Sequence, residues 1–342
     1  MPSTTLITGA TGFIAGHCIE QLLKADYKVI GTIRSQEKGK RLAAAFPEAI
    51  ESGQLVFETV SDVRSEEEFK TLFQKHKDIK YVLHTASPFH FNVEDPVKDM
   101  LDPAVEGTLT VLKTVKQYAP QVDKVVITSS FAAMLNQAEV DNSSSLITEA
   151  SWNPVTWDEA SQKGNLLATY LASKKFAEKA AWDFKDSEKP SFGITTVNPG
   201  YVFGPGIALD AKSLNTSNEA IVQGALSTKP GQDTPEGPCH MWVDVRDVAK
   251  AHISAISRSL DNQRLMLCVS KWCNQDLLDV VNKEVPELKG KIATGKPGSG
   301  KETDKQGFQF DNEKTRKELN YDWITLDKSV KDFAEQWLSF QK

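Results

Sequence analysis

The sequence predicts a doubly wound α/β fold, in which a parallel sheet carries helices on both faces, followed by a smaller C-terminal lobe. Over roughly the first 190 residues, short apolar or β-branched runs alternate with stretches whose apolar residues recur at helical spacing. The first run, residues 4–8, leads through a glycine turn at Gly9 and Gly12 into helical spacing from Phe13. Such alternation is typical of parallel sheets with right-handed crossovers.

The glycine turn has the spacing Gly9-x-x-Gly12-x-x-Ala15. Gly9 permits a tight turn, Gly12 lets the backbone approach a pyrophosphate, and the small Ala15 lets the helix lie close to the strand. The helix start offers free N–H groups and a partial positive charge to phosphates. Because the turn follows a strand and opens a helix, it predicts dinucleotide binding.

Composition narrows the class of protein. With 342 residues, 40% hydrophobic and 25% charged, the chain can bury a full core, and its net charge of −6 argues against a nucleic-acid or anionic-membrane partner. A strand predicted from residue 4 leaves no room for a signal peptide, and no apolar run approaches about 18 residues. Cys18, Cys239, Cys268 and Cys273 show no metal-ligand spacing, so we expect no metal and reduced thiols in the cytoplasm.

The second strand, residues 28–33, follows a helix over residues 13–25 and ends at Arg34. An Asp or Glu at this position normally binds the adenosine ribose hydroxyls, whereas an Arg suits a 2′-phosphate. Lys38 lies in the first turn of the next helix and is either a second positive charge for that phosphate or a solvated surface residue. The pattern favours NADPH over NADH.

The third strand, residues 55–60, is followed by Asp62 and a helix over residues 65–76. Ser65 and Glu68 have the spacing of a capping box for this helix. Since the helix then has its own cap, the Asp62 carboxylate is a candidate to bind the adenine amino group.

The fourth strand, residues 81–86, contains His84 within an apolar run, and we interpret it as a core histidine rather than a catalyst. Phe89 and Phe91 follow the carboxyl end of this strand, where ligands bind in open α/β sheets. They either line a pocket or cover the core.

A helix over residues 99–118 leads to the fifth strand, residues 124–130, which ends at Ser130. Residues 136–165 are polar and irregular, and we expect them to cover the site as a loop. The fifth strand therefore brings a hydroxyl to the same edge of the sheet as the glycine turn.

Tyr170 and Lys174, four residues apart, share one face of the next predicted helix. A tyrosine with a pKa near 10 exchanges protons poorly at neutral pH unless a cation lowers that pKa. We expect Lys174, with the nicotinamide charge of an oxidised cofactor, to do so. Ser130 would hold a carbonyl oxygen while Tyr170 delivers the proton. Surface packing alone also explains this spacing, and only the order of glycine turn, Ser and Tyr-x-x-x-Lys makes it specific.

The sixth strand, residues 192–197, leads to Pro199, which either places backbone against the nicotinamide or only ends the strand. Tyr201 either lines the substrate pocket or packs in the core.

Residues 206–240 are rich in Ser, Gly and Pro and predict an inserted segment on the substrate side. Residues 243–247 predict a structural lock of charge pairs and helix capping, before a helix over 248–258, a strand over 264–269 and further helices.

Residues 295–301 imitate the phosphate-binding pattern G-x-x-x-x-G-K, but Glu302 stands where a Ser or Thr should bind magnesium. No good strand precedes the segment. We therefore expect a flexible loop and no second nucleotide site.

The chain resembles the extended short-chain dehydrogenase/reductase family. The motifs are residues 8–15 (TGATGFIA), 62–63 (DV), 83–88 (LHTASP), 128–130 (TSS), 170–174 (YLASK), 198–205 (NPGYVFGP) and 243–249 (VDVRDVA). Within the family it is similar to fungal NADPH-dependent carbonyl reductases of the methylglyoxal and 3-methylbutanal reductase type. Residues 35–38 (SQEK), 173–179 (SKKFAEK) and 214–217 (LNTS) carry that narrower likeness.

The resemblance implies catalysis by Ser130, Tyr170 and Lys174, with NADPH/NADP+ as cofactor. The implied cofactor contacts are Gly9, Ala10, Thr11, Gly12, Phe13, Ile14, Arg34, Lys38, Asp62, Val63, Thr85, Ala86, Tyr170, Lys174, Pro199, Val202 and Ser217. The candidate substrate pocket comprises Phe89, Phe91, Phe131 and Tyr201. Gly200 and Phe131 depart from the family pattern, and both could reshape that pocket.

The expected organisation is a Rossmann domain over residues 1–190, completed by strands within 191–204 and 241–269. Residues 205–240 and 270–342 would form a smaller substrate-binding lobe, with the substrate in the cleft between the two parts.

These features predict reduction of aldehydes and ketones, such as methylglyoxal, 3-methylbutanal and aryl or aliphatic ketones, to alcohols by an NADPH-dependent, cytoplasmic enzyme. Its partner is a small-molecule carbonyl, and the family implies a possible homodimer. One alternative is an NAD-dependent sugar-nucleotide epimerase or dehydratase, which prefers an acidic residue at Arg34. Others are a plant-like flavonoid or cinnamoyl reductase, and a non-catalytic NADP-sensing module, which usually lacks the tyrosine.

Replacing Arg34 with Ala is expected to weaken NADPH binding roughly ten- to hundredfold, because one charged hydrogen bond contributes about 1.5–3 kcal/mol. NADH binding should change little. Titration of both nucleotides gives the two dissociation constants, and equal losses for both would contradict a contact with the 2′-phosphate.

Overall fold

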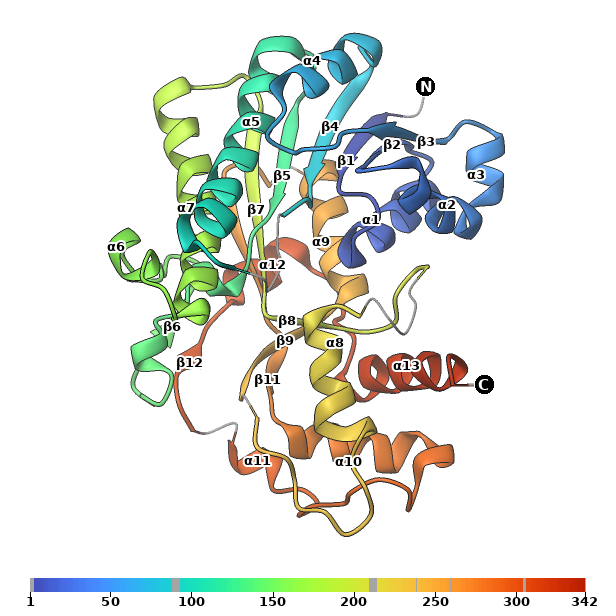
Figure 1. The fold of residues 1–342 in the computed structure, drawn as a ribbon, viewed down its shortest axis with the longest axis vertical. Coiled ribbons are helices and arrows are strands. Elements are labelled where there is room, and N and C mark those ends of the chain that lie inside the picture. Colours follow the sequence, from blue (N-terminus) through green and yellow to red (C-terminus); the bar gives the residue numbers. More distant parts are fainter. Residues whose placement is uncertain are drawn as a thin grey trace.

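The computed structural model describes residues 3–87, 93–208, 214–237, 239–258, 260–303 and 306–341. Its centre is a seven-stranded sheet in the order β10-β7-β5-β4-β1-β2-β3, with every neighbouring pair parallel (Figure 1). The strands are β1 (Thr4–Thr8), β2 (Lys28–Ile33), β3 (Leu55–Thr59), β4 (Ile79–His84), β5 (Lys124–Thr128), β7 (Gly193–Pro199) and β10 (Gln263–Leu267). The doubly wound parallel sheet is confirmed.

Helices cover both faces of the sheet because successive strand residues point to opposite sides. Leu6 belongs to one buried cluster and the adjacent Ile7 to the other. The face of Ile7 packs against α1 (Phe13–Lys24), α2 (Gln36–Ala45), α3 (Pro47–Glu51), α9 (Val245–Ser257) and α12 (Glu313–Leu319). The face of Leu6 packs against α4 (Glu66–Lys75), α5 (Asp102–Tyr118) and α7 (Leu166–Glu188).

Most predicted bounds differ from the structure by a few residues. The helix expected to start at Asp99 begins with a π-helical turn, η1 (Val97–Leu101), before α5. Pro199 is the last residue of the sixth strand, where it pairs with Leu267 of β10, and the Gly200 N–H donates to the Leu267 carbonyl at 3.1 Å. The expected loop over 136–165 holds short elements, η3 (Gln137–Glu139), β6 (Leu146–Ile147) and α6 (Trp157–Ala160), and β6 pairs with β12 (Gln309–Phe310).

A third hydrophobic cluster surrounds Phe203, Trp242 and Trp272. These residues belong to strands that are drawn below the main sheet in Figure 1. The strands β8 (Tyr201–Phe203), β9 (His240–Asp244) and β11 (Ser270–Trp272) form a three-stranded sheet there. The accompanying helices are α8 (Thr216–Ile221), η4 (Val222–Leu226), α10 (Asn274–Glu284), η5 (Pro286–Leu288), α11 (Gly300–Thr303) and α13 (Leu326–Ser339).

Gly200 is required by packing where β7 passes into β8. A Cβ atom at this position would lie 2.5 Å from the Met241 carbonyl oxygen. A larger residue would force the backbones of β8 and β9 apart, so Gly200 acts through strand packing in this chain.

The loop over residues 295–301 does not offer its N–H groups to a phosphate. The Lys296 N–H donates to Gln275 Oε1 at 2.9 Å, and the Gly298 N–H donates to Asp279 Oδ2 at 2.7 Å. Because a carboxylate of α10 already occupies the turn, a phosphate there would meet like charge.

The charge pairs and helix cap of residues 243–247 join the start of α9 to the C-terminal part of the chain, around Ile324 and Asp332. Asp244 caps α9 by accepting from the Arg246 N–H at 2.8 Å, and its carboxylate binds the Arg246 side chain at 2.7 and 2.8 Å. Arg246 also binds Asp332 of α13 at 2.5 Å. Asp247 accepts from the Ile324 N–H at 2.8 Å, so both acidic residues tie the C-terminal helices to the sheet.

Replacing Asp244 with Ala is expected to lower the free energy of unfolding by about 2–4 kcal/mol, since the buried cap disappears and Arg246 loses one carboxylate partner. The matched control is Lys328→Ala, which removes the 58% exposed partner of Asp332 and should leave stability almost unchanged. Urea denaturation measures both, and equal effects would contradict the lock.

Candidate active site

The glycine turn between β1 and α1 has the geometry of a phosphate cradle. Gly9 has φ of +68°, and a Cβ there would lie 3.0 Å from the Ala86 Cα. The Gly12 N–H donates to the Gly9 carbonyl at 2.9 Å, and Gly12 begins α1 without a side-chain cap. The first turn of α1, with Phe13 and Ile14, therefore presents its N–H groups to an anion.

Thr8 holds the ends of β1 and β4 together beside this turn. Its hydroxyl bonds to His84 Nδ1 at 2.9 Å and accepts from the Ala86 N–H at 3.1 Å. The Thr85 hydroxyl donates to the Thr8 carbonyl at 2.6 Å. His84 is 3% exposed, and burial lowers its pKa to about 4, so it is the neutral core histidine that the apolar strand predicts.

Arg34 directly follows β2, and Lys38 lies in the first turn of α2; both side chains are exposed. Asp62, after β3, is bound by Arg64, whose Nη2 lies 2.8 Å from Asp62 Oδ2. The hydrogen bond from Arg64 lowers the pKa of Asp62, and the charge of Arg34 adds to this effect. The adenine contact of Asp62 stays a prediction, and Arg64 already binds the carboxylate that would make it.

The predicted capping box of α4 is only half formed. Ser65 Oγ accepts from the Glu68 N–H at 3.3 Å, but the Glu68 carboxylate turns to the Ser61 N–H at 2.8 Å. Val63 packs against α5, since a Cβ on Gly107 would lie 2.9 Å from a Val63 methyl carbon. Glu68 therefore holds the loop after β3, which positions Asp62 and Val63.

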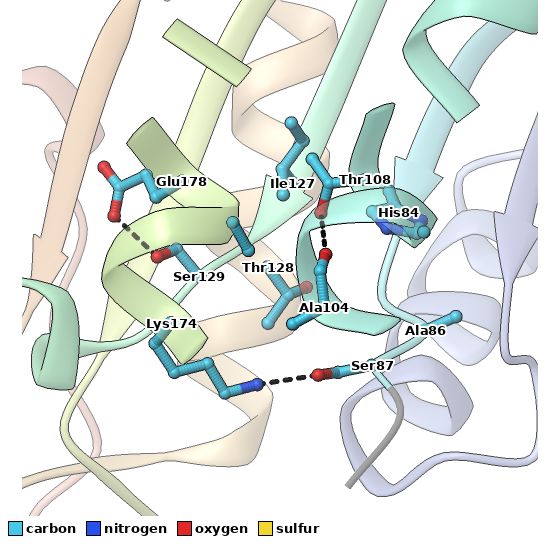
Figure 2. Close-up of a pocket in the computed structure, with 12 residues that line it drawn as sticks. His84, Ala86, Ser87, Ala104, Thr108, Ile127, Thr128, Ser129, Lys174 and Glu178 are labelled. Atoms are coloured by element: carbon cyan, nitrogen blue, oxygen red, sulfur yellow. Dashed lines mark hydrogen bonds between the residues drawn. The ribbon is translucent and has the colours of Figure 1, made fainter. Parts of the chain in front are cut away.

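Ser130, Tyr170 and Lys174 come together at the carboxyl edge of the sheet. Ser130 caps η2 (Phe131–Ala133) after β5, and its side chain is hydrogen-bonded to Tyr170 of α7. Lys174 Nζ lies 5.8 Å from the centre of the Tyr170 ring and donates to Ser87 Oγ at 2.8 Å (Figure 2). The structure thus joins three residues that are up to 44 positions apart in the chain.

Burial, and not the lysine charge, dominates the pKa of Tyr170. Burial raises that pKa, the hydrogen bond with Ser130 opposes the rise, and Tyr201 adds to it. Burial also lowers the pKa of Lys174 to about 8. In this structure both groups are buried and the Lys174 ammonium donates to Ser87. That Lys174, with the nicotinamide charge of an oxidised cofactor, lowers the pKa of Tyr170 stays a prediction.

A small cavity of about 20 Å³ lies behind Lys174, between α5, α7 and the ends of β4 and β5 (Figure 2). His84, Ser87, Thr108 and Ser129 contribute polar groups to its wall. It has room for about one water molecule. Such limited hydration is the physical reason that Lys174 holds its proton less tightly than a surface lysine.

The four pocket candidates differ in their surroundings. Tyr201 lies against His240 and Trp272, with ring centres 5.7 and 5.3 Å apart. Phe131 is 5% exposed and stacks on Phe308 at 5.8 Å within a hydrophobic cluster, so the structure gives it a packing role. Phe89 and Phe91 lie outside the described residues.

Val202 and Ser217, two implied cofactor contacts, are neighbours. The Val202 N–H donates to Ser217 Oγ at 3.0 Å, and Asn215 Nδ2 donates to the Val202 carbonyl at 3.1 Å. The start of α8 is thereby held against β8, near the end of β7 where Pro199 lies. Their contact with a cofactor stays a prediction.

Glu178 of α7 is the main polar residue that the sequence analysis missed. It is 1% exposed, and Ser129 Oγ and Asn198 Nδ2 each donate to its Oε2 at 2.6 Å. Arg264 Nε donates to Oε1 at 2.6 Å, and Asn198 Nδ2 also donates to the Ser130 carbonyl at 3.2 Å. Glu178 therefore holds the backbone that carries Ser130.

A spacing signal for Glu178 was present in the sequence. Tyr170, Lys174 and Glu178 follow one another at intervals of four and so share one face of a helix. The partners of Glu178 after β5 and in β7 and β10 carry no comparable signal, because no fixed spacing in the sequence links them to α7.

Among the described residues, no three His, Cys, Asp or Glu side chains are grouped to hold a metal ion. In the same part of the chain, none of the helices combines the length and apolar character needed to cross a membrane.

Replacing Lys174 with Met is expected to raise the melting temperature of the cofactor-free protein by a few degrees at pH 7, since the native state then buries no ammonium. The advantage should shrink between pH 8 and 10.5, because native wild-type protein sheds this proton near 8 whereas the unfolded chain keeps it to 10.5. Thermal unfolding across this range measures the effect.

Lys179→Met is the matched control, since Lys179 lies on the same helix and its side chain is 51% exposed. It should show no comparable pH dependence. If Lys174→Met melted below the wild type at pH 7, the prediction would be contradicted. The hydrogen bond to Ser87 would then stabilise the native state by more than the burial of the ammonium destabilises it.

Comparisons with known proteins agree with this geometry. Residues 5–267 match the model of the NAD dependent epimerase/dehydratase family. The chain is 44% identical over 345 residues to the NADPH-dependent methylglyoxal reductase Gre2 of Saccharomyces cerevisiae, covering 99% of each protein. It is 43% identical to a putative NADPH-dependent methylglyoxal reductase of Candida albicans, covering 98% of each.

The crystal structure of Gre2 from Candida albicans in complex with NADPH superposes with a TM-score of 0.93 at 42% identity, covering 100% of both chains. A UDP-glucose 4-epimerase of Thermotoga maritima, 18% identical with a TM-score of 0.71, shares the fold. The chain belongs to the NAD dependent epimerase/dehydratase family.

Proposed function

We propose that this chain is an NADPH-dependent reductase that converts aldehydes and ketones to alcohols. The observation that carries the proposal is the hydrogen-bonded pair of Ser130 and Tyr170 with Lys174 beside it, at the sheet edge that also holds the Gly9–Gly12 turn. Relatives more than 40% identical over nearly the full length are named as NADPH-dependent methylglyoxal reductases, which supports the same reaction class.

The residues present fit a bound NADPH. The uncapped start of α1 suits the pyrophosphate, and the exposed Arg34 with Lys38 suits the 2′-phosphate. The positive φ of Gly9 brings the turn against Ala86. NADPH, when bound, supplies the hydride that reduces the carbonyl carbon.

The proton of the reaction comes from Tyr170 in this proposal. Its raised pKa keeps the phenol protonated at neutral pH, which suits a donor. The proton passes from Tyr170 Oη to the carbonyl oxygen, and the phenolate that remains is stabilised by the Ser130 hydroxyl and the Lys174 ammonium. Ser87 keeps the ammonium directed into the site.

The proposed substrate pocket lies between the main sheet and the smaller lobe. Residues 1–190, with the later strands, would bind the cofactor, and residues 205–240 and 270–342 would supply the substrate side. Tyr201 links the two parts, because its ring contacts Trp272 and it acts on the pKa of Tyr170. Such an aromatic wall suits small apolar or aryl carbonyls.

We also propose that the protein acts in the cytoplasm and forms a homodimer. The first proposal is supported by four cysteines that are all thiols in this structure, and the second by family resemblance. Arg34, where an acidic residue suits NAD, disfavours an epimerase, and the intact Tyr170 disfavours a sensor without turnover.

The test is oxidation of NADPH by the purified protein with methylglyoxal, 3-methylbutanal and several aryl ketones, with NADH in parallel. We expect turnover with NADPH, little with NADH, and a fall in kcat of roughly a hundredfold or more for Tyr170→Phe, which keeps the ring but lacks the proton. Tyr118→Phe, on the surface of α5, is the matched control. A protein that purifies with bound NAD and ignores all carbonyls would contradict the proposal.

A further inference from the structure

Two cysteines of the smaller lobe directly flank the paired strands β9 and β11, Cys239 before β9 and Cys273 after β11. The antiparallel pairs are Ser270 with Trp242, Lys271 with Met241 and Trp272 with His240. The same register, continued by one step, would place Cys273 opposite Cys239. Both cysteines are half-buried.

The two segments are also held together beyond this pair. Asn274, which follows Cys273, donates from Nδ2 to the carbonyls of Pro235 at 3.1 Å and Glu236 at 3.2 Å. The cysteines are thus bracketed by the last strand pair on one side and by the Asn274 hydrogen bonds on the other. Their backbones cannot separate widely without breaking one of these contacts.

Register also sets the direction of the two side chains. Residues directly opposite each other in an antiparallel pair point to the same face of the sheet. In this ladder, Trp242 and Ser270 form such a pair, and Trp242 Nε1 donates to Ser270 Oγ at 2.9 Å. Opposite residues have Cα atoms about 4.5–5.5 Å apart. Disulfides span Cα separations of about 4.4–6.8 Å, so the register of the β9–β11 ladder, continued by one step, would bring Cys239 and Cys273 within reach of each other.

We propose that Cys239 and Cys273 form a redox-sensitive disulfide that staples the smaller lobe when the protein meets a small-molecule disulfide such as oxidised glutathione. The Cys239 thiolate attacks the glutathione disulfide and releases one glutathione. The Cys273 thiolate then attacks the Cys239 sulfur and releases the second. Two protein thiols are oxidised, one glutathione disulfide is reduced to two thiols, and the two protons pass to these leaving groups.

The order of attack follows from the surroundings of Cys273. Its thiol donates to Asp276 Oδ2 at 3.2 Å, and Cys273 is the N-cap residue of α10. Burial raises the pKa of Cys273, and the Asp276 carboxylate adds to the rise, so this thiol is a slow first nucleophile. Cys18 and Cys268 are fully buried, and burial raises the pKa of both, which makes them internal controls.

A disulfide between Cys239 and Cys273 would also affect the proposed substrate pocket, a consequence that rests on the proposed function. His240 and Trp272, the pair next to the cysteines, both contact the Tyr201 ring. A bond at Cys239 and Cys273 would fix the spacing of the strands that hold this aromatic wall. Oxidation should therefore change KM for carbonyls more than the Kd of NADPH.

The test is equilibration of the full-length protein with oxidised glutathione, followed by alkylation, proteolysis and mass spectrometry. We expect the peptides of Cys239 and Cys273 to be joined, while Cys18 and Cys268 stay unmodified. Closing the intervening loop should raise the melting temperature by about 5 °C, reversed by dithiothreitol. Neither readout depends on enzymatic activity, so failure here is distinguishable from failure of the proposed function.

Cys239→Ser and Cys273→Ser should each abolish both the joined peptides and the rise in melting temperature. Serine is a good N-cap, so Cys273→Ser should keep α10 intact, and Cys239→Ala gives a second variant at the other position. Glutathione attached to one cysteine without a protein disulfide would overturn the proposal. So would a disulfide that leaves the melting temperature unchanged.

Discussion

The structure around the site depends on one buried carboxylate, that of Glu178. A charge in the interior is costly unless several donors surround it, and Glu178 receives bonds from β5, β7, β10 and its own helix. Arg264 extends the network to the carbonyls of Glu149 and Ser151 and lies over the Trp152 ring, with its guanidinium 3.9 Å from the ring centre. One carboxylate therefore positions α7 relative to β5, β7 and β10, and through Arg264 it also positions the segment that contains Glu149 and Ser151.

This network holds the elements that carry Ser130, Tyr170 and Lys174 in fixed positions relative to one another. Asn198 bridges Glu178 and the Ser130 carbonyl, so the end of β5 is held relative to α7, which carries Tyr170 and Lys174. On the other side, Thr8 fixes the end of β4 and the Gly9 turn. Because all strands are parallel, their carboxyl ends share one edge, and both networks act there.

The smaller lobe is joined to this frame by charge pairs and aromatic contacts. Arg246 links Asp244 at the end of β9 to Asp332 of α13, and the Tyr201 ring reaches from β8 to Trp272 of β11. Any change in the spacing of β9 and β11 is transmitted to Tyr201, and thus to the surroundings of Tyr170. The cysteine pair lies at the end of that ladder, where a covalent bond would have the most direct effect.

The sequence by itself determined what depends on near neighbours in the chain. Strand and helix periods, the positive φ at Gly9, the place of Arg34 after β2 and the shared face of Tyr170 and Lys174 all follow from spacing of a few residues. Family motifs then indicated the Ser130 partnership. These features set the fold class and the candidate catalytic residues.

Only the tertiary structure decided what depends on burial and on partners far away in the chain. The sequence could not show that Asn198 binds Glu178, that Phe131 packs on Phe308, or that Gly200 lies against Met241. The lowered pKa of Lys174, which reflects lost water, also depends on the folded surroundings. Solvation and partner choice are properties of the folded environment, and residues far apart in the chain, such as Glu178 and Arg264 at 86 positions, create that environment together.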